Sequence, residues 1–576
     1  MTLFSPWAKS VDLKNPLPEY PRMQLRRGSF HSLNGIWEYQ ITHGGEPDPN
    51  KGWSRIIVPF ALGSKLSGTD VNLLPREVLW MRKQFSYQKD NERTFLNFEA
   101  VDQCCTVYLN GMEVGSHAGG YTPFSLNVTE AIKPENELLL RITDDSDQGL
   151  YAYGKQKIEN GGMWYTPSAG IWQTVWLEDL PVHAVEDIKI TPDCDRSAVY
   201  LRTAGDFSQI VITVFAGEEL VHRGITNKKD YTIPIKDIHY WSPEDPFLYT
   251  MYLQTEEETV KSYFAMRKFS SMRDASGILR FALNGEPLFL SGLLDQGYNC
   301  DGLLTYPSEE SMIADLKITR EMGFNMIRKH NKVECRRWYY LCDRYGILVM
   351  QDIPGGGGPY DFMRTAVLPT IGFRKLSDKE YEKNGRGSEE SRSAYYTELY
   401  QILDMLYNTA CIFAWVPFNE GWGQFDSVAV TDAVREYDTT RLIDSASGWH
   451  DMGAGDFNSR HCYFRAFHVP RADSRILLLS EFGGYTYAEK GHHEAANLYG
   501  YKKFTDKANW NAAVLKLFEH DVLHNIPKGL SGSIYTQLAD VEDECNGLLS
   551  ADRRIVKIDV RRMRRLNERC YRSLKK

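Results

Sequence analysis

Two glutamates that each follow a short apolar run could form a catalytic pair. Glu420 comes after the run 412–418 and Asn419, and Glu481 comes after the run 476–480. Runs of this length, rich in β-branched and aromatic side chains, are typical of fully buried strands. Two carboxylates that face one pocket can cleave an acetal, because one donates a proton to the leaving oxygen while the other attacks the anomeric carbon.

The neighbours of the two glutamates indicate a division of roles. We assign Glu420 as the acid/base, since the like charge of a second carboxylate should raise its pKa. Asn419 beside it can hydrogen-bond a ring hydroxyl of the sugar. Glu481 is then the nucleophile, kept ionised by donors such as Arg328 and Tyr463. The separation of the two carboxyl groups, which the sequence does not give, decides between retention and inversion.

After residue 281 the hydrophobic period changes, and buried strands alternate with amphipathic helices, expected over 309–322, 334–345 and 395–407. Eight such alternations predict a (β/α)8 barrel, whose active site lies at the carboxyl ends of its strands. The expected strands, of which the sixth has the weakest pattern, are 288–294, 326–329, 348–352, 412–418, 442–445, 463–469, 476–480 and 532–536.

Polar or aromatic side chains follow these strands, so one end of the barrel should collect them. We predict that the substrate is bound by seven of them: Asp295, Arg328, His330, Asn419, Trp449, Tyr463 and Tyr535. The segment 354–390 is too long for an ordinary barrel connection, which predicts a lid or rim of the pocket, with Gly355 to Gly358 as a flexible loop.

The remainder of the chain predicts two β-rich domains before the barrel. Residues 1–182 contain short β-rich segments separated by turn signals, which favours a jelly-roll sandwich. Residues 183–272 hold six or seven further short strands, as in an immunoglobulin-like sandwich. The catalytic barrel then occupies residues 273–576. Trp164, Tyr165 and Trp172 could line a sugar site, although packing against the next domain is the better explanation.

Composition excludes several function classes. A net charge of −9 with interspersed signs argues against a nucleic-acid partner. No apolar run approaches the roughly 18 residues of a membrane span, and residues 1–20 lack the apolar core of a secretory signal. Ten scattered cysteines suit a reduced, cytoplasmic protein. We therefore expect neither a membrane partner nor secretion.

No cofactor is expected, because the sequence has no glycine-rich loop with phosphate-binding spacing. A metal site is the weaker alternative to the carboxylate pair. His330, Glu420, His461 and His468 could act as ligands, but no spacing in the sequence links them. We therefore expect no metal.

Several motifs together resemble glycoside hydrolase family 2, the family of β-galactosidases, β-glucuronidases and β-mannosidases. The resemblance covers nearly the whole chain. Asn419-Glu420 and Ser480-Glu481-Phe482-Gly483 are similar to the family's acid/base and nucleophile motifs. Further likeness lies in Leu33-Asn34-Gly35-Ile36-Trp37, Tyr108-Leu109-Asn110-Gly111, Gly119-Gly120-Tyr121-Thr122-Pro123-Phe124, Gly170-Ile171-Trp172-Gln173, Trp241-Ser242-Pro243-Glu244-Asp245-Pro246-Phe247-Leu248-Tyr249 and Asn284-Gly285-Glu286-Pro287.

The resemblance implies a retaining mechanism, Arg328 near the nucleophile and an aromatic site residue at Tyr535. The Asn-x-Lys pair with which β-glucuronidases hold the uronate would fall near 544–546 and is absent, although Lys329 or Lys332 could supply another clamp. We expect an exo-glycosidase acting on an oligosaccharide or glycoconjugate, with β-galactosidase first and β-uronidase or α-L-arabinosidase as alternatives. A non-catalytic carbohydrate-binding protein is the alternative of a different class. Whether the chain forms a homo-oligomer is left open.

Overall fold

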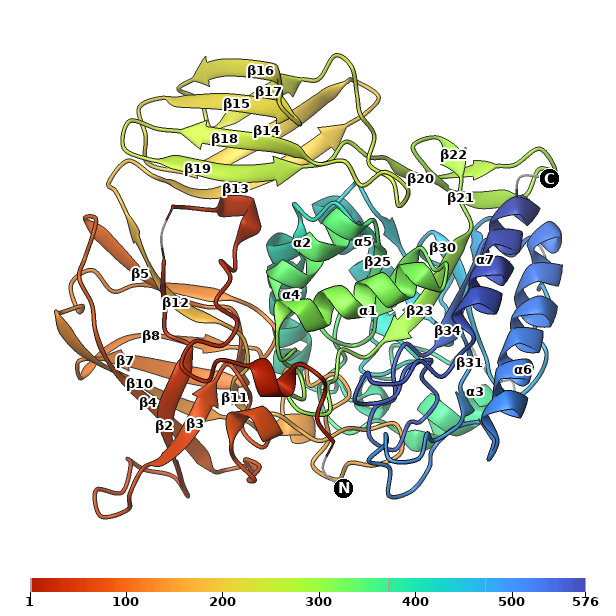
Figure 1. The fold of residues 1–576 in the computed structure, drawn as a ribbon, viewed down its shortest axis with the longest axis horizontal. Coiled ribbons are helices and arrows are strands. Elements are labelled where there is room, and N and C mark those ends of the chain that lie inside the picture. The colour runs from red at the N-terminus through yellow and green to blue at the C-terminus, as the bar shows by residue number, and fades with distance from the viewer. Residues whose placement is uncertain (1–2, 29, 371–372, 374–375, 472, 575–576) are drawn as a thin grey trace.

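The computed structural model describes residues 3–28, 30–370, 373, 376–471 and 473–574. Three regions follow one another along the chain (Figure 1): an all-β region in red and orange, a smaller β region at the top of the view, and a barrel coloured green to blue. Among the described residues, no helix has the length and apolar character needed to cross a membrane.

The first region is a sandwich of two antiparallel sheets. The six-stranded sheet has the order β3-β2-β4-β10-β7-β8 and the four-stranded sheet the order β1-β12-β5-β9, while β6 and β11 form a small ribbon. Buried and more exposed residues alternate along β7 and β10, so each sheet turns one apolar face to the core between them. The strands are β1 His31–Ser32, β2 Gly35–Thr42, β3 Ser54–Val58, β4 Val78–Ser86, β5 Arg93–Phe98, β6 Val101–Asp102, β7 Cys104–Leu109, β8 Met112–Ala118, β9 Phe124–Asn127, β10 Glu135–Thr143, β11 Gly170–Ile171 and β12 Val175–Leu180.

A second sandwich pairs the sheets β13-β14-β17 and β16-β15-β18-β19, and the short sheet β20-β21-β22 leads from it into the barrel. A separate apolar core fills the space between its two main sheets. Its strands are β13 Val185–Asp193, β14 Ala198–Gly205, β15 Ile210–Ala216, β16 Glu219–Thr226, β17 Asp230–Pro234, β18 Tyr249–Gln254, β19 Thr259–Phe264, β20 Phe269–Arg273, β21 Leu279–Leu283 and β22 Glu286–Pro287.

The third region is a parallel eight-stranded sheet of order β28-β26-β25-β24-β23-β34-β31-β30. Its two outer strands are bridged where Asp456 N donates to Ile443 O at 2.7 Å, so the sheet curls into a nearly closed barrel. The strands are β23 Leu290–Asp295, β24 Met326–Lys329, β25 Leu348–Asp352, β26 Ile412–Val416, β28 Leu442–Ile443, β30 Phe457–Cys462, β31 Ile476–Gly483 and β34 Gly532–Thr536. The main helices are α1 Glu309–Glu321, α2 Arg336–Tyr345, α4 Glu389–Leu406, α5 Ser427–Tyr437, α6 Lys507–Leu517 and α7 Val560–Leu574.

The fold class predicted from the sequence is confirmed, and seven of the eight expected strands overlap strands of the barrel. The prediction for the sixth strand was wrong. The structure forms β30 from Phe457–Cys462 and leaves most of 463–469 as a connection. The sequence Phe-Asn-Ser-Arg-His-Cys has only two apolar residues, because its inward positions carry polar side chains, so the hydrophobic pattern pointed to the next segment instead. The exact domain boundaries stay a prediction.

The glycines after β25 hold the first sandwich against the barrel. Tyr153 N and Gly154 N both donate to Gly355 O, at 3.0 and 2.9 Å, and Gly357 N donates to Tyr151 O at 3.2 Å. A Cβ on Gly356 would lie 2.3 Å from Tyr151 O. These glycines therefore permit close backbone approach, where the sequence suggested a flexible loop. Residues 371–372 and 374–375 of the predicted lid lie outside the described residues.

We expect Gly356→Ala to destabilise the contact between the first sandwich and the barrel by about 1–3 kcal/mol, as overpacking does elsewhere. Differential scanning calorimetry should show a lower melting temperature. Gly358→Ala is the matched control, since the nearest atom to a Cβ there is Gly385 O at 3.7 Å. Equal melting temperatures for the two variants would contradict this account of Gly356.

Candidate active site

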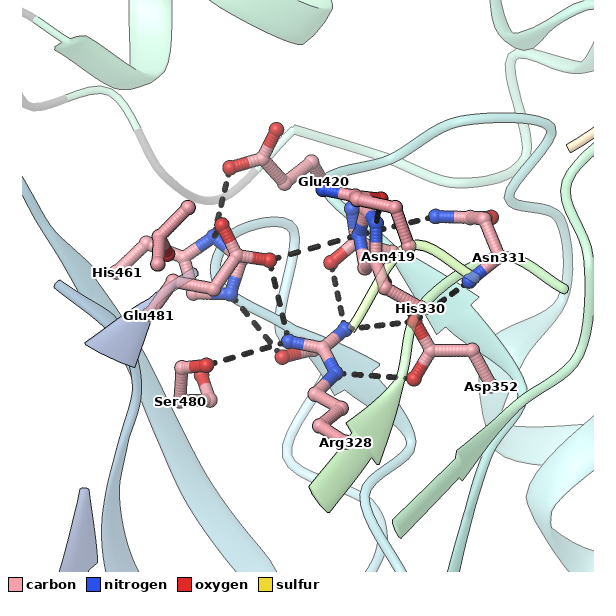
Figure 2. A network of polar contacts seen from close by, with 12 residues as sticks. Arg328, His330, Asn331, Asp352, Asn419, Glu420, His461, Ser480 and Glu481 are labelled. Atoms are coloured by element: carbon pink, nitrogen blue, oxygen red, sulfur yellow. Dashed lines mark hydrogen bonds and ion pairs between the residues drawn. The ribbon is translucent and has the colours of Figure 1, made fainter. Parts of the chain in front are cut away.

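The ends of the fourth and seventh barrel strands bring the two glutamates together (Figure 2). The short strand β27 (Phe418–Asn419) extends the line of β26 and pairs with β29 (Ala446–Ser447), and Glu420 follows it directly. Glu481 lies within β31. One carboxylate oxygen of Glu420, one of Glu481 and a ring nitrogen of His461 all lie within 4.8 Å of one another. The arrangement is therefore a pair of carboxyl groups facing a shared space.

Hydrogen-bond donors surround Glu481. Arg328 Nη1 lies 3.2 Å from its Oε1, and the Tyr463 hydroxyl donates to its Oε2. His330 Nε2 lies 3.6 Å from Oε1, which is too far for a hydrogen bond. Burial raises the pKa of Glu481, while His461, Arg328 and the Tyr463 hydroxyl oppose that rise. Donors of this kind favour the ionised carboxylate, as the nucleophile requires.

Arg328 is fully buried and connects several strand ends. Its guanidinium donates to both oxygens of Asp352, at 2.9 and 3.0 Å, and to Asn419 Oδ1 at 2.8 Å. That last bond fixes the orientation of the Asn419 amide, whose Nδ2 has no hydrogen-bond acceptor among the described residues. The amide N–H is thus a donor left for a ligand hydroxyl.

Glu420 has a different environment. Its Oε1 lies 2.6 Å from His461 Nδ1, and its backbone adopts a left-handed φ of 52°, which is strained for a residue with a side chain. Burial raises the pKa of Glu420 to about 7, with Lys155 and Arg328 opposing and Glu544 adding to the rise. The sequence had attributed this rise to the second carboxylate, whereas burial is its main cause in the structure.

His330 and Trp449 lie beside the two glutamates. His330 Nδ1 is 2.8 Å from Gln296 Oε1, so the ring is held facing Glu481. Trp449 packs edge-to-face on His461, with ring centres 5.2 Å apart. The structure therefore brings five of the seven predicted binding residues to the carboxylates: Arg328, His330, Asn419, Trp449 and Tyr463. Their roles in binding stay a prediction.

Two of the predicted binding residues are placed elsewhere. Tyr535 is fully buried and packs against Phe482 and Phe518 in the core between the barrel and its outer helices. The next residue, Thr536, reaches the site, where its Oγ1 lies 2.9 Å from the Tyr463 hydroxyl. Side chains alternate along a strand, so a shift of one residue moves an aromatic to the other face.

Asp295 is the second correction. Its carboxylate accepts from Lys329 Nζ and, at 2.9 Å, from the backbone of Gly297. Lys329 also binds Glu334, and Lys332 binds the same Glu334 oxygen at 2.7 Å. These groups form a buried network that saturates the Asp295 carboxylate. Lys329 and Lys332 are likewise committed, so neither is available as the carboxylate clamp considered from the sequence.

The sequence named His461 only as a possible metal ligand, and it did not predict that Lys155 of the first sandwich reaches the site. Trp164, from the segment 151–166, lies 4.9 Å from Trp422 after the acid/base. Lys155 of the same segment binds Glu544 Oε2 at 3.2 Å, and both are buried. No spacing rule links these residues. The aromatic cluster at Trp164 was the one sequence feature that indicated a role in the site, and packing between domains was the preferred explanation for it.

A cavity of about 170 Å³ opens beside Glu420. Aromatic rings form much of its wall, and Arg465 is the one cationic residue of the described lining. Sugar rings and other flat groups can pack on such faces. The lining comprises Met163, Thr365, Ala366, Pro369, Glu420, Trp449, His461, Cys462, Tyr463, Phe464, Arg465, Tyr499 and Tyr501.

The group Glu420, His461 and Glu481 could also hold a divalent ion. However, His461 Nδ1 and Glu420 Oε1 are 2.6 Å apart, a hydrogen-bond distance. Two ligands on one tetrahedral zinc ion would lie about 3.3 Å apart. The geometry favours the hydrogen bond.

Comparison with known proteins places this site in a family. Residues 65–169 match the family described as glycosyl hydrolase 2 galactose-binding domain-like, and residues 279–466 match the glycosyl hydrolases family 2 TIM barrel domain. A structure titled β-glucuronidase from an uncultured Clostridium species is 16% identical, has a TM-score of 0.74, and is matched over 96% of this chain and 99% of its own. That likeness concerns the fold alone.

Curated relatives carry two names. The chain is 28% identical over 310 residues to a β-galactosidase of Thermoanaerobacter pseudethanolicus, covering 49% of this chain and 40% of that protein. It is 23% identical over 438 residues to a β-glucuronidase of Streptococcus agalactiae serotype V, covering 70% and 68%. The chain spans about half or less of the length of three relatives. The matches cover 53%, 40% and 37% of those proteins. The two matched domains, which together span about half of the chain, show that it belongs to glycoside hydrolase family 2.

Proposed function

We propose that this chain is a retaining exo-glycosidase that removes a terminal β-linked sugar. The observation that carries the proposal is the close approach of Glu420 and Glu481, since one carboxylate oxygen of each lies within 4.8 Å of the other. Retaining enzymes place their two carboxyl groups about 5–5.5 Å apart, whereas inverting enzymes leave about 6.5–9.5 Å for a water molecule. The short separation supports direct attack by a carboxylate.

In the proposed reaction, Glu481 attacks the anomeric carbon while Glu420 protonates the departing oxygen. The product is a glycosyl ester on Glu481 and a free aglycone. Glu420, now ionised, then takes a proton from water, which hydrolyses the ester and restores both groups. Arg328 and Tyr463 stabilise the ionised Glu481 at the start and end of this cycle.

The charges around the carboxylates favour a neutral sugar. Arg328 is paired with Asp352 and Glu481, and Lys155 with Glu544. A uronate that bound to Arg328 or Lys155 would take that cation from its buried partner and leave a buried carboxylate unpaired. A β-galactoside is therefore the first candidate, in line with the name of the Thermoanaerobacter relative.

A β-glucuronide is the second candidate, because the relative named β-glucuronidase aligns over a larger share of this chain. Its carboxylate would need Arg465, the exposed cation of the cavity lining. The sequence alternative of an α-L-arabinoside has no separate observation in its favour.

A panel of 4-nitrophenyl glycosides tests both candidates and the non-catalytic alternative. Purified protein should release dye fastest from the β-galactoside, with the β-glucuronide as the competing substrate. Faster release from the glucuronide would overturn the neutral-sugar assignment. The absence of release from every sugar, together with sugar binding detected by calorimetry, would support a carbohydrate-binding protein instead.

Changing each glutamate to glutamine should reduce activity in a different way. Glu481→Gln removes the nucleophile, so turnover should fall by about 10⁴-fold or more on every substrate. Glu420→Gln removes the proton donor, so it should cost about 10²- to 10⁴-fold on phenyl glycosides and far less when a dinitrophenyl group leaves unaided. Steady-state kinetics on the two leaving groups measures the difference. Equal losses for both variants on the dinitrophenyl glycoside would show that the roles are misassigned.

The pH profile of kcat/KM should follow the same assignment. Glu420 must be protonated to act as an acid, and its pKa is about 7, so activity should fall as the pH rises through about 7. Glu481 must be ionised, and its pKa is raised by burial, so activity should also fall on the acid side at a pH above the usual range of a glutamate. In Glu420→Gln, assayed with the dinitrophenyl glycoside, the alkaline limb should disappear. Its persistence would assign that limb to another group.

A further inference from the structure

A buried chain of polar side chains leads from Glu420 away from the cavity. Glu420 Oε1 lies 2.6 Å from His461 Nδ1, and His461 Nε2 lies 3.1 Å from Ser447 Oγ. Ser447 Oγ lies 3.5 Å from Ser459 Oγ, the longest link. Ser459 Oγ donates to Asp444 Oδ2 at 2.6 Å. Ser447, Ser459, His461 and Asp444 are all at least 95% buried.

Neighbouring strands hold this chain in place. Ser459 and His461 are two residues apart on β30 and therefore share one of its faces. Ser447 pairs with Asn419, and its carbonyl accepts from Glu420 N at 2.9 Å. Gly448 has a φ of +92°, and a Cβ there would lie 2.6 Å from His461 Nδ1. Because Gly448 has no side chain, the imidazole of His461 can pack against its backbone.

An ionised Asp444 favours one direction for the hydrogen bonds of the chain. A carboxylate only accepts, so Ser459 must donate to it, and the Ser459 oxygen can then accept from the Ser447 hydroxyl. The oxygen of Ser447 in turn accepts from His461 Nε2–H. In this arrangement the imidazole is neutral and has a lone pair on Nδ1, which accepts from the protonated carboxyl of Glu420 at 2.6 Å and lies 3.5 Å from Glu481 Oε2.

A proton on Asp444 reverses the direction of these hydrogen bonds. Asp444 would donate to Ser459, Ser459 to Ser447, and Ser447 to His461 Nε2, so that Nδ1–H donates to an ionised Glu420. The two arrangements contain the same number of protons and differ by one proton shift along each link. Charge on one terminal carboxyl therefore accompanies a proton on the other.

We propose that Asp444 is a positioning residue for the acid/base, which acts through Ser459, Ser447 and His461 to hold Glu420 in its protonated form. The inference rests on the proposed function, because it concerns the proton that Glu420 gives to the leaving group. Burial raises the pKa of both Asp444 and Glu420 to about 7, and above that pH an ionised Asp444 favours the arrangement in which Glu420 keeps its proton. Such a chain suits a group that must be an acid in one half-reaction and a base in the next.

Other charged groups also act on the two ends of the chain. Lys155, Arg328, Glu544 and Glu481 surround Glu420, and Arg328, Asp451 and Asp352 surround Asp444. Among the described residues, the Ser447 hydroxyl is hydrogen-bonded to Ser459 and His461 and to none of these charged groups, so Ser447→Ala interrupts the chain and leaves these charges in place.

Ser447→Ala and Ser459→Ala test the proposal. Without the chain, His461 can place its proton on Nδ1 and stabilise ionised Glu420, so the alkaline limb of kcat/KM should move about one pH unit lower. One unit corresponds to about a tenfold loss above the limb for phenyl glycosides. Dinitrophenyl glycosides, which need no proton, should be affected less than about twofold. Ser459→Thr, which keeps the hydroxyl, should restore the wild-type profile.

Ser445→Ala is the matched control, since Ser445 is a buried neighbour of Asp444 whose hydroxyl contacts Thr431 at 2.7 Å, outside the chain. It should leave the alkaline limb unchanged. A limb that stays in place in Ser447→Ala and Ser459→Ala would overturn the proposal. So would equal losses on phenyl and dinitrophenyl glycosides, because they would indicate a structural role only.

Nitrogen NMR of the imidazole separates this proposal from the proposed function. The His461 signals, identified by their loss in His461→Gln, should show Nε2–H in the wild type near pH 8 and an increased Nδ1–H population in Ser447→Ala. An inactive wild type with this result would reject the glycosidase assignment and keep the hydrogen-bond chain. Unchanged nitrogen shifts in Ser447→Ala would reject the chain, whatever the activity.

Discussion

Arg328 is a fully buried cation, and the relative positions of four strand ends depend on its hydrogen bonds. It is carried by β24 and contacts Asp352 at the end of β25, Asn419 on β27 and Glu481 on β31. A buried charge is costly unless its partners are well placed, and removing it would leave Asp352 and Glu481 as uncompensated buried charges. The guanidinium therefore requires the barrel to close in one register. The same register sets the distance between Glu481 and the Asn419 amide.

The first sandwich contributes side chains to the candidate site of the barrel. Its segment 151–166 pairs with Gly356 through a backbone bridge at Ala152 and places Trp164 against Trp422. Lys155 and Tyr165 of this segment both bind the Glu544 carboxylate. The charge of Lys155 opposes the raised pKa of Glu420, and that of Glu544 supports it. The pKa of Glu420 thus depends on a side chain from outside the barrel, which makes the interface between the two regions part of the candidate site.

The sequence could predict the barrel and its two glutamates because buried parallel strands are continuous apolar runs and the polar residues after them stand out. The sequence-based prediction failed where a strand lacks this contrast between an apolar run and the polar residues after it. β30 carries Asn458, Ser459 and His461, so its own pattern resembles a loop. At β34 the apolar contrast located the strand correctly, but it could not tell which neighbour faces the pocket, and Tyr535 was chosen where Thr536 reaches Tyr463. Contacts between distant regions, such as Lys155 with Glu544, leave no local pattern at all.

Glu481 is buried and Glu420 is largely so, and burial raises the pKa of both, so burial alone cannot separate an acid from a nucleophile. The difference lies in the partners of each carboxylate. Glu481 receives hydrogen bonds from a guanidinium, which can only donate, and from the Tyr463 hydroxyl, whereas the closest partner of Glu420 is an imidazole that can either donate or accept. Glu481 should therefore lose its proton first, and its negative charge then makes the second ionisation harder. The order of ionisation follows from the contacts of Arg328 and Tyr463. A change in the direction of the His461 hydrogen bonds could alter the proton affinity of Glu420 while leaving the nucleophile charged.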